Sequence, residues 1–174
     1  RVTGPTLRAA GVARDLRKDE PYAAYPDVDF EVAVEYNGDV YDRFTVRQEE
    51  MRQSISIIRQ ALARLDKTHD KATFRADVPD WVLPPKEEVY NDMEALIFHF
   101  KAVMGEVEVP VGEIYHCVEG GNGELGFYIV SDGGRTPFRV HLRRPCFIYY
   151  QAYPEIIKGG MLSDAILTMS SMNV

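Results

Sequence analysis

Residues 38–54 read GDVYDRFTVRQEEMRQS, a glycine turn that leads into a segment rich in charged and amide side chains. Apolar residues then recur in alternating steps of four and three, at Met51, Ile55, Ile58, Leu62 and Leu65. This spacing is typical of a helix that packs lengthwise against another helix. Thr45 and Gln48 have the spacing of a capping box, so the stretch predicts a helix over residues 45–66.

A second helix of the same period is expected over residues 86–104. Its apolar residues are Val89, Met93, Leu96, Phe100 and Val103. Gly105 follows as a C-cap residue. Two helices of matching period that follow one another pack most simply as an antiparallel pair.

Beyond Gly105 the apolar residues alternate with polar ones, which is the period of β-strands. Strands are expected over residues 113–118, 124–131 and 136–143. GGNG at 120–123 and DGG at 132–134 have the composition of hairpin links, so we expect a three-stranded antiparallel meander. Its core-facing residues would be Leu125, Phe127, Ile129, Phe138, Val140 and Leu142.

The two ends of the chain differ in character. Residues 1–44 are interrupted by glycine and proline and are expected to be extended or irregular, with one short strand at 27–34. Residues 161–172 predict a helix that is buried through Leu162, Ala165, Ile166 and Met169. The expected fold is therefore α+β, a single fragment over residues 1–174 with segments 1–44, 45–104, 105–144 and 145–174.

Composition limits the classes of function. The net charge of −7 and the lack of a basic run argue against a nucleic-acid partner. No apolar run reaches the ~20 residues of a membrane span. Two separate cysteines, Cys117 and Cys146, suit a reducing compartment. The chain starts at Arg1 and stops directly behind an apolar segment, so we expect it to be part of a longer protein and inactive alone.

Familiar catalytic patterns do not occur in the sequence. The four histidines, His69, His99, His116 and His141, lack metal-ligand spacing, and no metal site is expected. The glycines at 120–123 separate two strands, whereas a phosphate-binding loop joins a strand to a helix. We therefore expect no catalytic residue within this chain.

A set of charged residues surrounds the start of the first helix: Asp39, Asp42, Arg43, Arg47, Glu50 and Arg52. Residues 43, 47 and 50 share one helix face, which predicts an Arg–Arg–Glu row. One interpretation is a buried ion network that fixes the helix to the preceding loop. The other is a polar path for protons.

Three further groups have two interpretations each. The basic residues Arg8, Arg14, Arg17 and Lys18 form either a solvated, self-paired surface or a docking surface for a neighbouring subunit. Arg139, His141 and Arg143 share one strand face, either solvated or facing an acidic partner or lipid headgroup. The aromatic run at 147–153 either packs in the core or lines an apolar pocket.

Several motifs, in order, resemble the quinone-proximal subunit of respiratory complex I, the NADH-quinone oxidoreductase D (49-kDa) family. They are TGPTLRAAGV at 3–12, DLRK at 15–18, PY at 21–22, residues 38–54, MEALIFHFK at 93–101, GELG at 123–126 and VSDG at 130–133. The resemblance implies descent from the large subunit of nickel–iron hydrogenases and a fold of that type. Three positions depart from the family pattern: Tyr149 and Gly160 replace histidines, and Asn173 replaces an aspartate.

The resemblance implies a role in the peripheral arm, on the cytoplasmic side of the bacterial inner membrane. Quinone would be reduced in a cavity shared with the subunit that holds the terminal iron–sulfur cluster, and membrane-arm subunits would be further partners. Only Met172 and Asn173 of this chain would approach that cavity, and the charge set at the start of the first helix would be a quinone-linked switch. No metal or flavin is implied here, and the NADH site would belong to other subunits. A hydrogenase large subunit and a non-catalytic interaction module are the alternatives.

Overall fold

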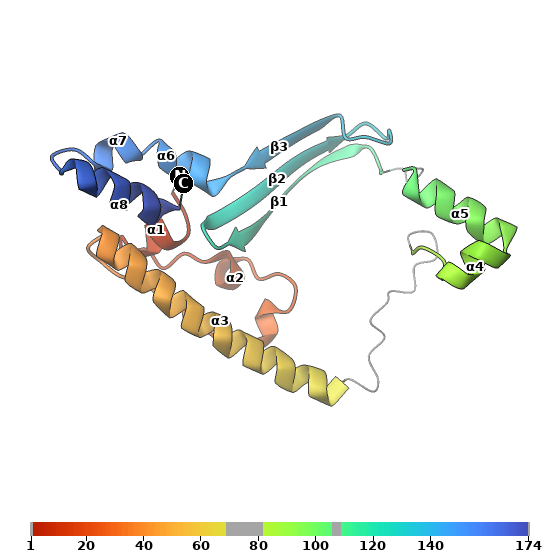
Figure 1. Ribbon diagram of the computed structural model, residues 1–174, viewed down its shortest axis with the longest axis horizontal. Coiled ribbons are helices and arrows are strands. Elements are labelled where there is room, and N and C mark those ends of the chain that lie inside the picture. Colours follow the sequence, from red (N-terminus) through yellow and green to blue (C-terminus); the bar gives the residue numbers. More distant parts are fainter. Residues whose placement is uncertain (1, 69–81, 106–108, 174) are drawn as a thin grey trace. The chain divides into compact units, whose positions relative to one another are not determined.

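The computed structural model describes residues 2–68, 82–105 and 109–173. The helices before the sheet are α1 (Pro5–Arg8), α2 (Leu16–Asp19), the 3-10 helix η1 (Tyr25–Asp27), α3 (Val40–Thr68), α4 (Lys86–Asn91) and α5 (Met93–Val103). The strands are β1 (Gly112–Gly120), β2 (Gly123–Ser131) and β3 (Arg139–Arg143), followed by α6 (Pro145–Tyr150), α7 (Tyr153–Ile156) and α8 (Leu162–Met172) (Figure 1). The described elements confirm an α+β composition.

The chain divides into two compact units. The first contains the residues up to 67, residues 116–127 and those from 142 on. The second contains residues 68–115 and 128–141.

Helix α3 begins at Val40, earlier than the predicted start at residue 45. Its first turn is closed by two aspartates. The Asp42 backbone N–H donates to Asp39 Oδ1 at 2.8 Å, and Asp42 Oδ2 accepts the N–H groups of Asn37 at 2.6 Å and Gly38 at 3.2 Å. The predicted capping box at Thr45 is therefore wrong, because Thr45 lies within the helix and its hydroxyl donates to the Asp42 carbonyl.

The part of α3 that enters the core is its beginning, where Asp42, Arg43 and Val46 are buried. The predicted seam along the rest of the helix is 50–60 % exposed at each apolar position: Met51, Ile55, Ile58, Leu62 and Leu65. Helices α4 and α5 belong to the other unit, so the antiparallel pairing with α3 stays a prediction.

The strand predicted at residues 27–34 is wrong. Residues 29–35 carry no strand, and glutamine side chains of α3 bind their backbone instead. Gln60 Oε1 accepts the Asp29 N–H at 2.8 Å while Gln60 Nε2 donates to the Asp29 carbonyl at 2.6 Å, and Gln53 Oε1 accepts the Glu31 N–H at 3.1 Å. A side-chain amide offers the same donor and acceptor as the backbone of a neighbouring strand. The segment therefore runs alongside α3 without forming strand-to-strand hydrogen bonds.

The core of the first unit combines the N-terminal segment with α3 and the C-terminal helices. Its buried apolar residues are Ala9, Leu16, Phe30, Val46, Tyr149 and Met172. The segment predicted to be irregular thus contributes half of these side chains: Leu16 lies in α2, Ala9 follows α1 and Phe30 follows η1.

The predicted second helix is two helices. At Asp92 the backbone is extended, with φ −122° and ψ 126°, and the Asp92 carboxylate accepts the N–H groups of Glu94 and Ala95, each at 3.3 Å. Asp92 therefore ends α4 and caps α5. The prediction of one continuous helix is wrong, whereas Gly105, with φ +85°, follows the end of α5 as expected.

The sheet has the order β1–β2–β3 and is the predicted meander. Residues 121–122 link β1 to β2, and Gly123 has a φ of +122°. The third strand begins at Arg139, three residues later than expected. The predicted core face is wrong at four positions, because the structure leaves these side chains exposed: Phe127, Phe138, Val140 and Leu142.

The C-terminal helix is confirmed as α8, but its predicted buried face is wrong. Thr168 and Met172 are the buried residues of α8, whereas Leu162 is 86 % exposed and Ile166 is 67 % exposed. Met169 is exposed as well. Within the residues described, no helix is long and apolar enough to cross a membrane.

Candidate functional site

A buried ion cluster joins the N-terminal segment, α3 and β1 around Arg8, which is 2 % exposed. Arg8 Nη2 lies 2.6 Å from Glu50 Oε1, and Arg8 Nη1 lies 2.9 Å from Glu119 Oε1 and 3.6 Å from Asp15 Oδ2. Arg17 completes the set by binding Asp15 side-on, with Nε–Oδ1 at 2.9 Å and Nη2–Oδ2 at 2.6 Å. We call these five residues the Arg8 cluster.

Local structure places each member of the Arg8 cluster. Arg8 is the last residue of α1, and the Asp15 carboxylate accepts the Arg17 N–H as the N-cap of α2. Glu50 lies on the third turn of α3. Glu119 lies near the end of β1, where its backbone N–H donates to the Tyr22 hydroxyl at 3.0 Å.

Burial and the neighbouring charges shift the pKa values of several groups in the Arg8 cluster. Burial opposes the charged form of Arg8, but Glu50 and Glu119 outweigh it and raise the pKa of the guanidinium. Burial likewise opposes ionisation of Asp15, but Arg17 outweighs it and lowers the pKa of that carboxyl. For Glu119 burial prevails over the bond from Arg8, so its pKa is raised. The arrangement binds three carboxylates with two cations, and it holds together segments far apart in the sequence.

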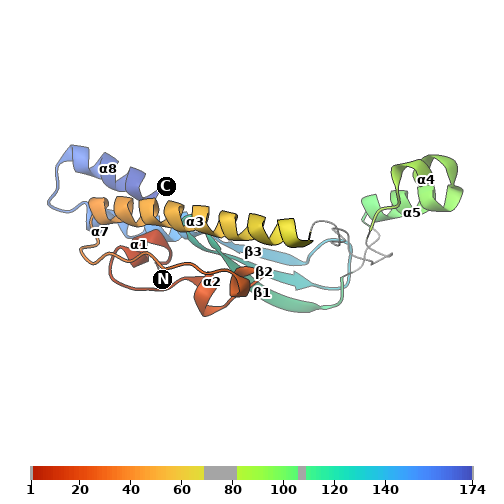
Figure 2. The ribbon, with the colours of Figure 1, turned by 90° about the horizontal axis from the view of Figure 1, so that it is seen from below.

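The predicted Arg–Arg–Glu row does not form as a unit. Glu50 binds Arg8, and Arg43 donates from Nε to Ser171 Oγ and from Nη1 to the Gly38 carbonyl, each at 2.8 Å. Arg43 thereby connects the start of α3 to α8, and both helices lie together in Figures 1 and 2. Arg47 has buried nitrogens without a hydrogen-bond partner among the described residues.

The other members of that charge set contact residues that are close to them in sequence. Asp39 and Asp42 close the first turn of α3. Burial opposes ionisation of Asp42, but the N–H groups of Asn37 and Gly38 outweigh it and lower the pKa of that carboxyl. Arg52 lies on the surface and binds Glu49 at 2.9 Å.

Sequence reasoning missed four residues of the Arg8 cluster: Arg8, Asp15, Arg17 and Glu119. The solvated interpretation of the N-terminal basic residues is wrong for Arg8, which is buried, and it holds for Arg14, whose side chain is half exposed. Arg8 and Glu119 are 111 positions apart, so no local spacing could have joined them. The only signal was that Arg8 lies in the TGPTLRAAGV motif quoted for the family resemblance.

A second group of polar contacts lies at the C-terminal end. The Tyr149 hydroxyl, on a side chain that is 1 % exposed, contacts the carbonyls of Thr3 and Asn122. Asn122 Oδ1 accepts from Asn173 Nδ2 at 3.1 Å, and Asn122 Nδ2 lies 3.2 Å from Cys146 Sγ. Asn122, in the turn between β1 and β2, therefore ties the end of α8 to α6.

A pocket of about 430 Å³ opens beside this group, lined by Arg144, Cys146, Phe147, Tyr150 and Asn173. Asn173, in the left-handed conformation with φ 57°, is exposed and lines this pocket, and its place in a quinone cavity stays a prediction. Met172 is fully buried and lies in the core. Both interpretations of the aromatic run hold for part of it, because Tyr149 is core whereas Phe147 and Tyr150 line the pocket.

The basic face predicted on the third strand is only partly free to meet a partner, because Arg143 binds within the chain. Arg143 Nη1 donates to the Glu124 carbonyl at 2.7 Å, and its Nε lies 3.5 Å from Glu124 Oε1. Arg139 and His141 are exposed.

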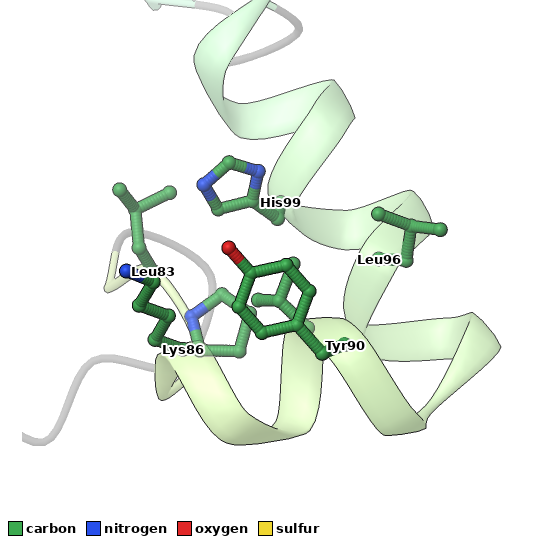
Figure 3. A pocket seen from close by; sticks show the side chains of 7 residues that line it. Leu83, Lys86, Tyr90, Leu96 and His99 are labelled. Carbon is green, nitrogen blue, oxygen red and sulfur yellow. The ribbon is translucent and has the colours of Figure 1, made fainter.

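The second unit contains a separate pocket of about 460 Å³ between α4 and α5 (Figure 3). Leu83, Pro84, Lys86, Val89, Tyr90, Leu96 and His99 line it. Figure 3 shows the Tyr90 hydroxyl pointing toward the His99 ring. Across the described part of the chain, no three His, Cys, Asp or Glu side chains are grouped so that they could hold a metal ion.

Comparison with known proteins gives a consistent result. The family model described as "Respiratory-chain NADH dehydrogenase, 49 Kd subunit" matches residues 1–174. The D subunit numbered 2 of the NADH-quinone oxidoreductase of Cytophaga hutchinsonii is 63 % identical over 172 residues, which is 99 % of this chain and 44 % of that protein. The corresponding D subunit of Leptospira biflexa is 55 % identical, over 99 % of this chain and 41 % of that protein.

A relative from Bdellovibrio bacteriovorus, named as the C/D subunit of NADH-quinone oxidoreductase, is 49 % identical over 99 % of this chain and 30 % of its own length. The chain thus spans less than half the length of these relatives. Because the family model covers every residue, the chain belongs to the family of the 49-kDa subunit of the respiratory-chain NADH dehydrogenase.

Proposed function

We propose that this chain is part of the quinone-proximal 49-kDa-type subunit of NADH-quinone oxidoreductase and that it forms part of the wall of the quinone-reduction cavity. The observation that carries the proposal is the pocket at the end of α8. It contains Asn173, one of the two residues expected near the cavity, on a chain that matches the 49-kDa family along its whole length.

The chemistry of the pocket suits a planar, weakly polar ring. Phe147 and Tyr150 offer aromatic faces, and the Arg144 guanidinium lies 5.3 Å from the centre of the Phe147 ring. The Asn173 amide can donate a hydrogen bond to a ring carbonyl. An amide cannot release a proton as a carboxylic acid does, so the protons that convert a quinone to a quinol must come from elsewhere.

Met172 has a supporting role in this proposal. Its buried side chain anchors the last turn of α8, and Arg43 holds the same turn through Ser171. The Arg8 cluster and the buried residues at the start of α3, Asp42 and Arg43, would then act as a scaffold that fixes the cavity wall. A proton path through Asp39, Asp42, Arg43, Arg47, Glu50 and Arg52 is less favoured, because Arg52 and Glu50 bind different partners and the set is not continuous.

In this proposal the subunit acts only within an assembled complex on the cytoplasmic side of the bacterial inner membrane. Its partners would be peripheral-arm subunits, including the one that holds the terminal iron–sulfur cluster, and membrane-arm subunits. The relative whose name combines the letters C and D supports a neighbour of the C type. Quinone would be the substrate of the complex, with no metal or flavin bound by this chain.

Membranes that contain the full-length subunit with Tyr150→Ala provide the test. We expect the KM for a short-chain quinone to rise several-fold, while NADH oxidation with a soluble acceptor that bypasses the cavity stays unchanged. Tyr36→Ala is the matched control, since Tyr36 is an exposed tyrosine that does not line this pocket. An unchanged KM in a fully assembled Tyr150→Ala complex would contradict the proposed cavity wall.

A non-catalytic interaction module of the same fold is the second candidate. The exposed apolar residues of α3 and α8 favour it, because such surface is typical of subunit interfaces. It predicts that Tyr150→Ala lowers assembly of the complex without changing the KM for quinone. A hydrogenase large subunit would need Cys-x-x-Cys pairs, and the two cysteines of this chain, Cys117 and Cys146, do not form one.

A further inference from the structure

Arg47 is a cation whose bonding is incomplete in this chain. Its Nε and Nη2 atoms are both buried, and neither has a hydrogen-bond partner among the residues that the structure describes. A guanidinium stays charged in proteins and has five N–H donors. Burying such donors without an acceptor is strongly unfavourable, so this edge of Arg47 should have a partner in the complete protein.

The same edge of two other arginines identifies the chemistry of that partner. Arg17 uses Nε and Nη2 to hold the two oxygens of Asp15. Arg8 uses Nε and Nη2 to hold Glu50 Oε1, at 2.9 and 2.6 Å. A side-on pair of parallel N–H groups matches a carboxylate in spacing and charge. The open Nε–Nη2 edge of Arg47 therefore fits a carboxylate.

The acidic residues near Arg47 already have other partners. Glu50, three residues later on α3, binds Arg8, and Asp42 accepts N–H groups of Asn37 and Gly38. Asp39 caps the helix by accepting the Asp42 N–H.

Arg43, one turn earlier on α3, adds to the positive charge. Its nitrogens bind two neutral oxygens, the Ser171 hydroxyl and the Gly38 carbonyl. Burial lowers the pKa of Arg43 and the nearby charge of Arg47 also lowers it, and together they outweigh Asp39 and Asp42, which raise it. Two neighbouring cations therefore lie where an anion would relieve both burial and mutual repulsion.

We propose that Arg47, with Arg43 beside it, binds a carboxylate side chain from a part of the same subunit outside these 174 residues. Relatives of this chain are more than twice as long as the region they share with it, so most of the parent subunit is available to supply this group. The position of Arg47 near the buried start of α3 also favours a carboxylate from the same polypeptide. The start of α3 lies beside α1 and α8 in both views, and Arg43 and Val46 are almost completely buried there (Figures 1 and 2). This inference does not depend on the proposed quinone site.

The experiment uses the full-length subunit in its assembled complex. Arg47→Glu should lower the amount of assembled complex on a native gel at least ten-fold, because two carboxylates would then face each other. Arg47→Lys should lower it less, since a lysine keeps the charge but not the paired donors. Arg52→Glu is the matched control, because it makes the same charge change on the exposed side of the same helix and should assemble normally.

The decisive step is a charge exchange in the Arg47→Glu background. Every Asp and Glu of the subunit outside residues 1–174 is changed singly to Arg. One such change should restore assembly with Arg47→Glu and should impair it when Arg47 is intact. The inference is overturned if Arg47→Glu assembles normally, or if none of these changes restores assembly. The same single changes are also made within residues 1–174 and in the other subunits, and restoration only by one of those likewise overturns the inference.

Discussion

At the scale of single residues, the Arg8 cluster depends on one cation shared by three carboxylates. Arg8→Met keeps an unbranched side chain of similar length but removes the charge, and it leaves Glu50, Glu119 and Asp15 short of a partner. We expect this change to lower the free energy of unfolding by about 3–5 kcal/mol, because removing one partner leaves buried charges uncompensated. Urea denaturation of the purified subunit, followed by circular dichroism, measures this loss.

Arg52→Met is the control for that measurement. Arg52 binds Glu49 on the exposed surface of α3, so the same substitution should leave the denaturation midpoint almost unchanged. Equal midpoints for Arg8→Met and Arg52→Met would show that the Arg8 cluster adds nothing to stability.

Glu119 gives the Arg8 cluster a dependence on pH. Burial raises the pKa of Glu119 above its ordinary value of 4.5, so the folded chain binds this proton more tightly than the unfolded chain does. Its contribution to stability is therefore fully present below pH 4.5 and is lost as the pH rises through the raised pKa. The pKa of Asp15 is lowered, so its contribution to stability is present above its ordinary value of 3.8 and is lost as the pH falls below that value.

Glu119→Gln isolates that effect because glutamine can still accept a hydrogen bond from Arg8 but does not titrate. We expect the difference in free energy of unfolding between the Gln variant and the wild type to grow as the pH rises from 4.5, and then to level off. Urea denaturation in a series of buffers from pH 4 to 8 gives this difference curve. A difference that stays constant with pH would contradict the raised pKa of Glu119.

At the scale of elements, Gly123 controls the entry from the turn into β2. It has a φ of +122°, and a Cβ there would lie 2.7 Å from Thr3 Oγ1 and would overlap the Tyr149 hydroxyl. Gly123→Ala should therefore lower the free energy of unfolding by at least ~1–3 kcal/mol, from backbone strain and from the loss of the Tyr149 contacts. Thermal denaturation of the subunit measures the loss.

The same turn offers a matched control in Gly121. A Cβ at Gly121 meets no atom within 4 Å, and its φ is not positive, so Gly121→Ala should change stability by no more than about 0.5 kcal/mol. A Gly123→Ala variant as stable as Gly121→Ala would mean that the turn does not need glycine at this position.

The contrast between the strands and the helices shows how far local pattern predicts elements. The meander was predictable because the alternation and both glycine-rich links are local signals. The break at Asp92 was missed because the four–three spacing of Val89, Met93 and Leu96 continues across it. The start of α3 was misplaced because Asp39, with Asp42 three residues later, is also a capping pattern and precedes the one at Thr45.

At the scale of the whole molecule, burial was the least predictable property. Apolar periodicity on α8 and along α3 indicated buried faces, but these faces are exposed in the described part of the chain. The Arg8 cluster could not be predicted for a related reason. Its members come from α1, the start of α2, α3 and β1, and they meet only after folding. Sequence spacing reports which residues share a face and does not report which segment lies against it.

The exposed apolar residues of α8 should govern the behaviour of the 174-residue chain in solution. Leu162 and Ile166 are 86 % and 67 % exposed, and Leu167 adds to the same helix. Uncovered apolar surface of this kind promotes association, so we expect concentration-dependent oligomers in sedimentation velocity experiments and strong binding of a hydrophobic dye. The double variant Leu162→Glu and Ile166→Glu should shift the population toward monomer and reduce dye binding.

The Leu162 and Ile166 variant both adds negative charge and removes apolar area, so a control is needed that adds the charge alone. Ser163→Glu with Ser170→Glu adds the same two negative charges to exposed positions of α8 while keeping its leucine and isoleucine side chains. We expect this control to associate more than the Leu162 and Ile166 variant does. If both double variants dissociate equally, charge repulsion accounts for the effect, and the apolar residues of α8 are then not the contact that drives association.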